Sequence, residues 1–214
     1  MEVVFIRHGQ TNANRDHRHQ SIDEPLNDNG RSQAQQIAIA LSAWQPTHIL
    51  SSPMKRAHQT ADIISASTNV SVELLQELRE LRRPLWIFNK RHRSAWTAWY
   101  ILRWFFSSHQ QFDNARQGES YLTFRKRLER VRSLLEQYPT DARIVVVSHS
   151  VFINFFTEHV CNTEKLSLWR AFPRFAKVLL LRNTNATRVI YAPADSNVCA
   201  WQLLDSDISV EKLT

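Results

Sequence analysis

Short apolar runs alternate with longer amphipathic segments along the chain. The runs are rich in β-branched and aromatic residues and predict buried strands at 3–6, 47–50, 70–75 and 144–147, with later strands at 176–181, 188–191 and 198–204. Apolar residues at helical spacing predict helices at 31–43, 91–108, 120–135, 151–160 and 163–170. A further helix is expected after strand 47–50, with Ser52 as its N-cap and Pro53 as its first residue.

This alternation predicts an α/β fold, a three-layer sandwich with a mostly parallel central sheet flanked by helices. Ligands of such sheets bind at the carboxyl ends of the strands. Arg7 and His8 follow strand 3–6, and His149 with Ser150 follows strand 144–147. Arg56 lies one turn into the helix after strand 47–50, so we expect these side chains at one edge of the sheet.

Two histidines and two arginines at one edge can bind and transfer a phosphoryl group. Arginine binds phosphate oxygens bidentately, and neutral imidazole is a competent nucleophile. Phosphoryl transfer needs chiefly positioning and charge stabilisation, so we expect neither a metal nor a cofactor. The leaving group still needs an acid, and the sequence LLQELREL at 74–81 offers Glu77 and Glu80.

The formal net charge of +7 over 214 residues favours anionic partners, namely phosphate esters, nucleic acid or an acidic membrane surface. For the basic residues of helix 120–135, a solvated outer face is preferred over a nucleic-acid surface; they are Arg125, Lys126, Arg127, Arg130 and Arg132. The apolar stretch 95–106 contains Arg103 and is too short to span a bilayer.

The two cysteines, Cys161 and Cys199, have no CxxC spacing, and we expect buried free thiols in a reducing cytoplasm. The first apolar run is too short for a signal peptide and lacks a basic flank. His17 and His19 have a metal-ligand spacing, but an ordinary loop is the preferred interpretation because no cysteine or carboxylate pattern lies nearby.

Ordered motifs cover nearly the whole chain. They are Arg7-His8-Gly9-Gln10-Thr11 with Asn14, Pro25-Leu26-Asn27 with Gly30 and Gln33-Ala34, Ser51-Ser52-Pro53-Met54-Lys55-Arg56-Ala57 with Thr60-Ala61, Leu78-Arg79-Glu80, Gly118-Glu119-Ser120 and Val147-Ser148-His149. With these motifs in this order, the sequence resembles the histidine phosphatase superfamily, which has the phosphoglycerate mutase-like fold.

The resemblance implies roles for individual residues. His8 would be the nucleophile that becomes phosphohistidine, and Arg7, Arg56 and His149 would complete the phosphate pocket. Thr11 and Asn14 would make ancillary contacts. Glu80 would be the acid in preference to Glu77, because Leu-x-Glu followed closely by proline fits the family better. Ser150 stands where the family usually has glycine, in the substrate-binding region.

The resemblance also implies one domain over residues 1–214, with a variable cap segment at about 85–117. The aromatic and basic residues at 86–106 would either line a pocket for the leaving group, pack the cap onto the core, or form a dimer contact.

The expected function is hydrolysis of a phosphate monoester. The alternatives are phosphoglycerate mutase-type transfer and non-catalytic binding of a phospho-ligand or RNA. The expected partner is a small phosphate ester, and a homodimer is also open. Nucleic acid is not expected as a partner.

Overall fold

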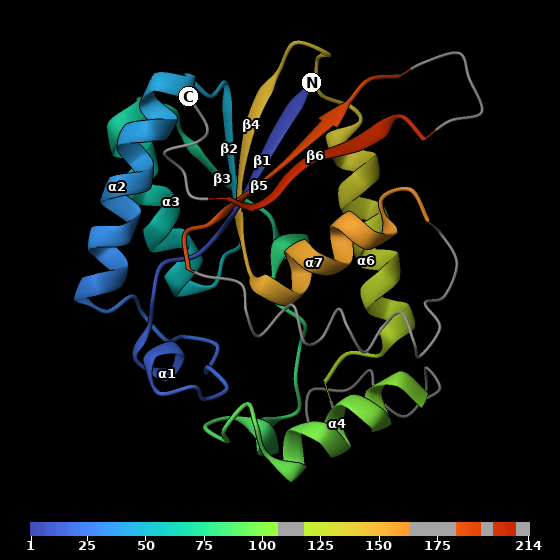
Figure 1. Cartoon of the computed structure of the whole chain (residues 1–214). Helices are drawn as coiled ribbons and strands as arrows, with labels where there is room; N and C mark the ends of the chain where they lie inside the picture. The colour runs from blue at the N-terminus through green and yellow to red at the C-terminus, as the bar shows by residue number, and fades with distance from the viewer. Residues whose placement is uncertain (107–117, 163–182, 194–198, 209–214) are drawn as a thin grey trace.

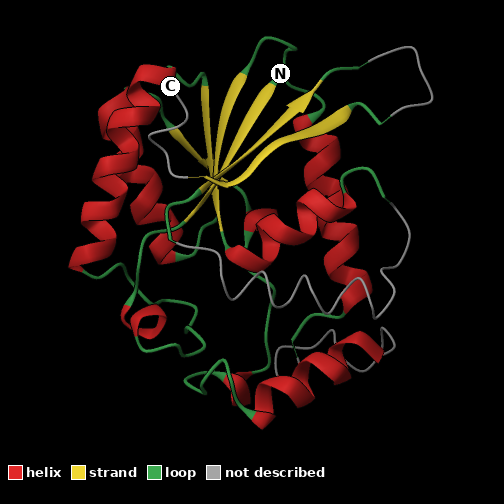
Figure 2. Cartoon of the chain, in the orientation of Figure 1, coloured by secondary structure: helices red, strands yellow, loops and turns green. Residues whose placement is uncertain are grey.

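A computed structural model describes residues 1–106, 118–162, 183–193 and 199–208. Six strands form one sheet in the order β3-β2-β4-β1-β5-β6, with helices on both faces (Figures 1 and 2). The strands are β1 (Glu2–Arg7), β2 (His48–Ser51), β3 (Val72–Leu74), β4 (Arg143–Ser148), β5 (Ala186–Tyr191) and β6 (Trp201–Ile208). The α/β fold is therefore as the sequence predicts.

The pairing of the strands aligns the catalytic candidates. Strands β1 to β4 run parallel, and β5 and β6 run antiparallel to their neighbours. Arg7 on β1 lies opposite Ser148 on β4, and Ser51 on β2 lies opposite Val147. The residues that follow these three strands consequently emerge side by side at one edge of the sheet.

Two hydrophobic cores lie on opposite faces of the sheet, because side chains alternate along each strand. Val4 and Ile6 belong to the core under α2 (Asp28–Trp44) and α3 (Lys55–Thr68). Val3 and Phe5 belong to the core under α6 (Tyr121–Leu135) and α7 (Ser150–His159). Every residue from 3 to 6 is fully buried, so the strand is the centre of the fold.

The remaining described elements lie beyond the carboxyl ends of the strands (Figure 1). They are α1 (Asn12–Arg15), the 3-10 helices η1 (Gln76–Leu78) and η2 (Leu85–Ile87), and α4 (Ala95–Phe106). Within the described residues, no helix is long and apolar enough to cross a membrane.

Several local expectations need correction. Helix α3 begins at Lys55 with Met54 as N-cap, so Ser52 is not the N-cap and Pro53 is not helical, although the Ser52 hydroxyl accepts from the backbone N–H of Met54 at 3.3 Å. Helix α1 was not expected from the polar stretch that contains it. The expected helix at 163–170 and strand at 176–181 fall outside the described residues.

The prediction of free thiols is wrong. Cys161 and Cys199 form a disulfide, with their Cα atoms 5.5 Å apart. Cys161 follows α7, and Cys199 precedes β6, so the fold brings together two positions 38 residues apart. Local spacing cannot reveal such a pair, because it reports only on neighbours along the chain.

Candidate active site

His8 lies at the end of β1 and is buried. Its Nδ1 is 2.7 Å from the carbonyl oxygen of Gly9, which assigns the proton to Nδ1 and leaves a lone pair on Nε2. Arg56 donates its Nε–H to that Nε2 at 3.2 Å. Burial, and then the charges of Arg56 and Arg7, hold the pKa of His8 well below its usual range. His8 is therefore a neutral imidazole with its lone pair directed at the arginine side of the site.

His149 follows β4 and provides the second imidazole, with its ring centre 5.1 Å from that of His8. Its Nε2 lies 2.9 Å from the hydroxyl of Ser52, the residue that follows β2. Burial, and then the charges of Arg56 and His8, lower its pKa. Within the described residues its buried Nδ1 has no hydrogen-bond partner, which is costly unless a ligand supplies one.

Arg56 is the buried cation of the site. Its Nη1 donates to the carbonyl oxygen of Ser21 at 2.9 Å, so the loop after α1 fixes the guanidinium. Burial lowers its pKa to about 10, which still leaves it charged at neutral pH. Gly9, directly after His8, lets the chain pack against the backbone of Gly30 in α2, since a Cβ there would lie 2.4 Å from the Gly30 carbonyl oxygen.

Glu80 faces these groups from the loop after η1. Its Oε1 accepts hydrogen bonds from the backbone N–H of Leu81 at 3.0 Å and of Phe152 at 3.2 Å. Its Oε2 accepts one from Val151 at 3.4 Å. Val151 and Phe152 are in the first turn of α7, where N–H groups lack partners inside the helix and are satisfied here by the carboxyl oxygens of Glu80. The helix that begins after His149 therefore also fixes Glu80.

Arg127 holds the loop that carries Glu80. Its guanidinium pairs with both oxygens of Glu119, at 2.9 and 2.7 Å. The same group donates to the carbonyl oxygens of Glu77 and Arg79 at 2.6 Å each. Our interpretation of Arg127 as part of a solvated face is therefore wrong: it is only 8% exposed. Its position three residues after buried Phe124 places it on the inward face of α6.

A second chain of contacts connects Glu80 to α4. Arg83 places its Nη2 3.9 Å from Glu80 Oε2 and donates Nη1–H to Nδ1 of His19 at 3.0 Å. Nε2 of His19 lies 2.9 Å from the Thr97 hydroxyl. Burial, and then the charges of Arg83 and His92, lower the pKa of His19 to about 2. His19 is thus a neutral structural link, and it is the buried member of the His17–His19 pair.

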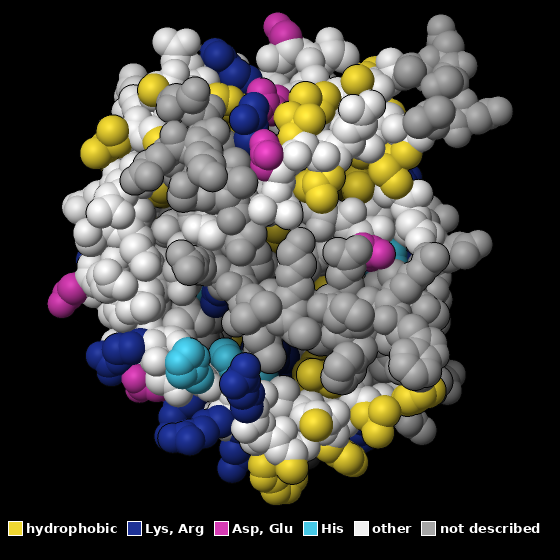
Figure 3. Space-filling view, viewed as in Figure 1, with side chains coloured by type: hydrophobic (Ala, Val, Ile, Leu, Met, Phe, Trp, Pro, Cys, Tyr) yellow, Lys and Arg dark blue, Asp and Glu magenta, His cyan; other side chains and the backbone are white. Residues whose placement is uncertain are grey.

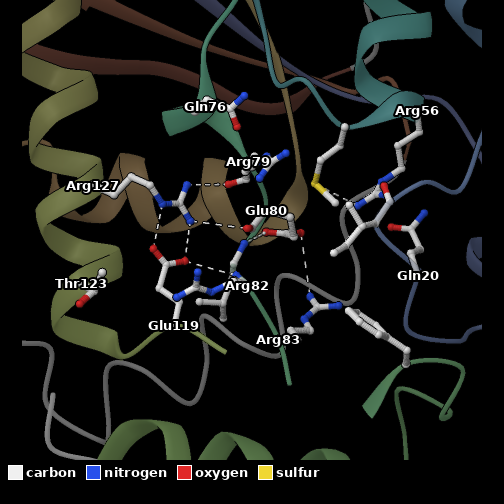
Figure 4. Close-up of a pocket in the computed structure, with 14 residues that line it drawn as sticks. Gln20, Arg56, Gln76, Arg79, Glu80, Arg82, Arg83, Glu119, Thr123 and Arg127 are labelled. Carbon is white, nitrogen blue, oxygen red and sulfur yellow. Dashed lines mark hydrogen bonds and ion pairs between the residues drawn. The ribbon is translucent and has the colours of Figure 1, made fainter. Parts of the chain in front are cut away.

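A cavity of about 280 Å³ lies beside the two histidines; Arg56 and Glu80 line it, whereas His8 and His149 are not among its lining residues. Figure 4 shows Glu80 in its centre, with Arg56 and Gln20 on one side and the Arg127–Glu119 pair on the other. Its lining also includes Arg79, Arg82, Arg83 and Phe88. Glu80 is among the described residues that line this cavity, and Glu77 is not.

The other expected binding residues lie around the turn after β1 and at the start of α7. The Thr11 hydroxyl accepts from the backbone N–H of Asn14 and from Gln20 Nε2. The Asn14 side-chain oxygen accepts from Gln20 and from Asn183. Ser150 is the buried first residue of α7, directly before the two amides that hold Glu80. Among the described residues, no group of three or more His, Cys, Asp or Glu could hold a metal ion.

The aromatic segment at 86–106 divides into several roles. Tyr100 and Trp104 are buried, and the Trp104 ring packs edge-on against Tyr121 and Phe155, which fits the interpretation of cap packing. Phe88 lines the catalytic cavity. Trp96 and Trp99 point outward and are about half exposed.

Sequence reasoning did not identify Ser52, Arg83, Arg127, Glu119 and Gln20 as site residues. Two signals could have found some of them: Ser52 follows a strand at the same edge as His8, and Arg127 has the spacing of the buried face of its helix. Arg83, Glu119 and Gln20 depend on loop conformation, which no periodicity reports.

Residues 3–196 match the family model described as "Histidine phosphatase superfamily (branch 1)". The protein named "Probable phosphoglycerate mutase GpmB" of Escherichia fergusonii is 27% identical over 208 residues, covering 94% of this chain and 90% of that protein. Its namesake from Cronobacter sakazakii is 28% identical over 210 residues, with the same coverages.

Solved structures are similar over nearly the whole chain. A mycobacterial glucosyl-3-phosphoglycerate phosphatase in complex with VO3 is 26% identical, with a TM-score of 0.73 and coverages of 97% of this chain and 99% of that one. An alpha-ribazole phosphatase from Shigella flexneri is 21% identical, with a TM-score of 0.70 and 97% coverage of both chains, and supports the fold alone.

Proposed function

The chain belongs to the histidine phosphatase superfamily, and we propose that it hydrolyses phosphate monoesters through a phosphohistidine formed on His8. The observation that carries this proposal is the neutral, buried imidazole of His8, oriented by Gly9 and flanked by the Arg56 guanidinium. An imidazole that is neutral at neutral pH needs no separate base before it attacks.

In the first step, Nε2 of His8 attacks phosphorus while the bond from phosphorus to the ester oxygen breaks. Arg56, Arg7 and His149 stabilise the charge on the three non-bridging oxygens. A phosphoryl oxygen placed here would also give the buried Nδ1 of His149 the partner it lacks among the described residues. Protonated Glu80 gives its proton to the departing alkoxide, so the alcohol leaves neutral.

In the second step, the Glu80 carboxylate takes a proton from water, and the oxygen of that water attacks the phosphohistidine. The phosphorus–nitrogen bond breaks, which returns the electron pair to Nε2 of His8. Inorganic phosphate is released and Glu80 is again protonated, so the cycle closes with one water consumed. The arginines supply the positive charge, and we propose no metal or cofactor.

The substrate we propose is an anionic small molecule whose charge extends beyond the transferred phosphoryl group. Beyond Glu80 the cavity is lined by Arg79, Arg82 and Arg83. Guanidinium groups in that position would bind a carboxylate or a second phosphate on the leaving group. The walls also include Leu81 and Phe88, which suit an apolar or planar body.

The test is chemical trapping of the intermediate. After brief incubation with radiolabelled p-nitrophenyl phosphate and an alkaline quench, the protein should carry an acid-labile, base-stable label. His8→Ala should abolish the label, and the partly exposed His58→Ala is the matched control that should keep it. Chelators should leave labelling unchanged. Label that persists in His8→Ala would refute the assignment of the nucleophile.

Phosphoglycerate mutase activity is the second candidate, favoured by the names of the curated relatives. A mutase returns the phosphoryl group to a second substrate, whereas a phosphatase transfers it to water. Release of phosphate from an aryl ester with and without added bisphosphoglycerate separates the two. We expect release without it, and no interconversion of phosphoglycerates.

A cytoplasmic location and the formation of a homodimer remain proposals. The Cys161–Cys199 disulfide is of a kind that persists in oxidising compartments, which weighs against a reducing cytoplasm. Measuring free thiols in protein extracted under alkylation would decide between the two. Sedimentation at several concentrations would determine the oligomeric state.

A further inference from the structure

Helix α4 is apolar on its exposed surface as well as on its inward face. Thr97, Tyr100 and Trp104 form the inward stripe and are buried. Outside this stripe, Trp96 and Leu102 are 57% and 56% exposed. A surface helix ordinarily carries polar residues on its outer face, and a helix that is apolar all round is usually buried or in contact with a membrane. The exposed apolar side chains of α4 therefore indicate a binding surface.

Neighbouring residues of η2 extend this outer face. Trp86 packs at a tilt against both exposed tryptophans, with its ring centre 6.1 Å from that of Trp96 and 5.7 Å from that of Trp99. We define the aromatic patch as the exposed side chains of Leu85, Trp86, Trp96, Trp99 and Leu102. Figure 3 shows hydrophobic side chains gathered over α4 at the lower edge of the molecule. Contiguous exposed apolar patches of this kind mark interaction sites.

A basic hollow adjoins the aromatic patch. Arg18, Lys90, Arg91 and Arg93 line a shallow, open depression of about 430 Å³ together with Phe88, Asn89 and Ser94. Lys90 connects the two features, because its Nζ lies 5.9 Å from the Trp96 ring centre. A further cation, Arg103, lies over Trp99 at 5.2 Å. Figure 3 shows Lys and Arg side chains beside the hydrophobic edge.

We propose that the aromatic patch and the basic hollow together bind the surface of an anionic lipid bilayer. Indole rings prefer the level of the lipid headgroups, since one edge is apolar and the N–H is polar. Leu85 and Leu102 would enter the acyl boundary below them. The cations of the hollow would meet lipid phosphates, to which basic residues near an anionic surface are attracted.

Two other occupants fit the features less well. A second copy of the chain, related by a twofold axis, would bring the cations of one hollow close to those of the other. A nucleic acid would stack on the tryptophans and pair with the cations but would leave Leu85 and Leu102 without a role. An anionic bilayer accommodates the apolar and the basic parts at once.

The position of the hollow relates it to the catalytic cavity. Phe88 lines both, so the two depressions adjoin at this residue. A bilayer bound at the hollow would lie beside the catalytic cavity. The inference does not depend on the proposed chemistry, because vesicle binding is measured without turnover.

The experiment is sedimentation of the full chain with vesicles of phosphatidylcholine, alone or mixed with phosphatidylglycerol. We expect binding to the anionic vesicles, loss of binding at high salt, and a blue shift of tryptophan emission. Arg91→Glu with Arg93→Glu should weaken binding by roughly 25-fold or more, because each basic residue near the surface contributes about fivefold. Trp96→Ser with Leu102→Ser should weaken binding and reduce the blue shift.

Matched controls lie elsewhere on the surface. Lys126→Glu with Arg130→Glu on α6 makes the same charge change, and Ile39→Ser on α2 removes an exposed apolar side chain. Both controls should bind like wild type, and all variants should hydrolyse p-nitrophenyl phosphate at the wild-type rate. Equal binding to neutral vesicles, or patch variants that bind like wild type, would overturn the proposal. So would a dimer or an oligonucleotide complex that the patch variants abolish while vesicle binding is absent.

Discussion

The two sides of the active site are built by different means. On the phosphate side, His8, Arg56 and His149 each follow a strand or lie one turn beyond it, and the register of the sheet places them together. On the acid side, Glu80 lies on a loop, positioned by the amides of α7 and by contacts from Arg127 and Arg83. The register of the sheet therefore sets the geometry of the phosphate side, whereas a few side-chain and backbone contacts set the geometry of the acid side.

This difference predicts that the two sides can be damaged separately. A change on the phosphate side should slow every phosphate ester alike, because every ester has the same phosphoryl group. In the first step, phosphorylation of His8, a change on the acid side should slow only esters whose leaving group needs a proton. The ratio of the alkyl to the nitrophenyl phosphorylation rate, measured in a single turnover, is therefore the measurement that distinguishes the two sides.

The largest effect is expected for Glu80→Gln. Loss of the general acid should slow alkyl phosphates by about 10²- to 10⁴-fold. The first release of nitrophenolate from nitrophenyl phosphate should be slowed much less, because nitrophenolate leaves without a proton; the second step loses its base whatever the ester. Glu77→Gln is the matched control three residues earlier and should change neither rate. A leaving-group effect in Glu77→Gln and none in Glu80→Gln would mean that the wrong carboxylate has been assigned.

Arg127→Lys tests whether the position of Glu80 depends on the contacts that Arg127 makes with Glu119 and with the loop that carries Glu80. Lysine keeps the charge but cannot bind Glu119 bidentately and reach the backbone carbonyls at the same time. Displacement of Glu80 by about 1 Å would cost up to roughly 10²-fold in the alkyl rate. The nitrophenyl rate should change little.

Arg130→Lys, on the exposed face of the same helix, is the control for Arg127→Lys and should behave as wild type. If Arg127→Lys lowers the rates with both esters equally and also lowers thermal stability, the role of Arg127 is purely structural.

Ser52→Ala tests the phosphate side. The variant removes the hydrogen-bond partner of His149 Nε2, at 2.9 Å. A neutral hydrogen bond of about 1 kcal/mol corresponds to roughly a fivefold loss of rate. We expect that loss equally for alkyl and nitrophenyl esters, so their ratio stays at the wild-type value. A changed ratio would show that the two sides are coupled.

The same division explains what the sequence could predict. His8, Arg56 and His149 could be placed because strand ends are visible as apolar runs, and parallel strands end at one edge of a sheet. The spacing of Arg127 could have placed it on the buried face of its helix but could not have shown its role, because its partners are backbone carbonyls of a loop 48 residues away in sequence. For the same reason the disulfide could not be predicted, since the fold brings Cys161, after α7, next to Cys199, before β6.

The smallest effect on rate is expected at His19, which links Arg83 to α4 on the acid side. Its folded pKa is about 2, well below the usual 6.5 of an unfolded chain. Below pH 6.5, His19 therefore binds a proton in the unfolded chain but not in the folded protein, and the free energy of unfolding falls as pH falls. At about pH 5 this one histidine costs about 2 kcal/mol of stability, and above 6.5 it costs nothing.

His19→Gln removes the titrating ring and keeps a donor for Thr97, so the loss of unfolding free energy between about pH 8 and pH 5 should shrink by that amount. Urea unfolding at both pH values gives the difference. Thr97→Val removes the same hydrogen bond but keeps the imidazole, and its pH dependence should match wild type. If His19→Gln also keeps the wild-type pH dependence, His19 does not remain neutral in the folded protein, and the contact from Arg83 to its Nδ1 would have to be abandoned.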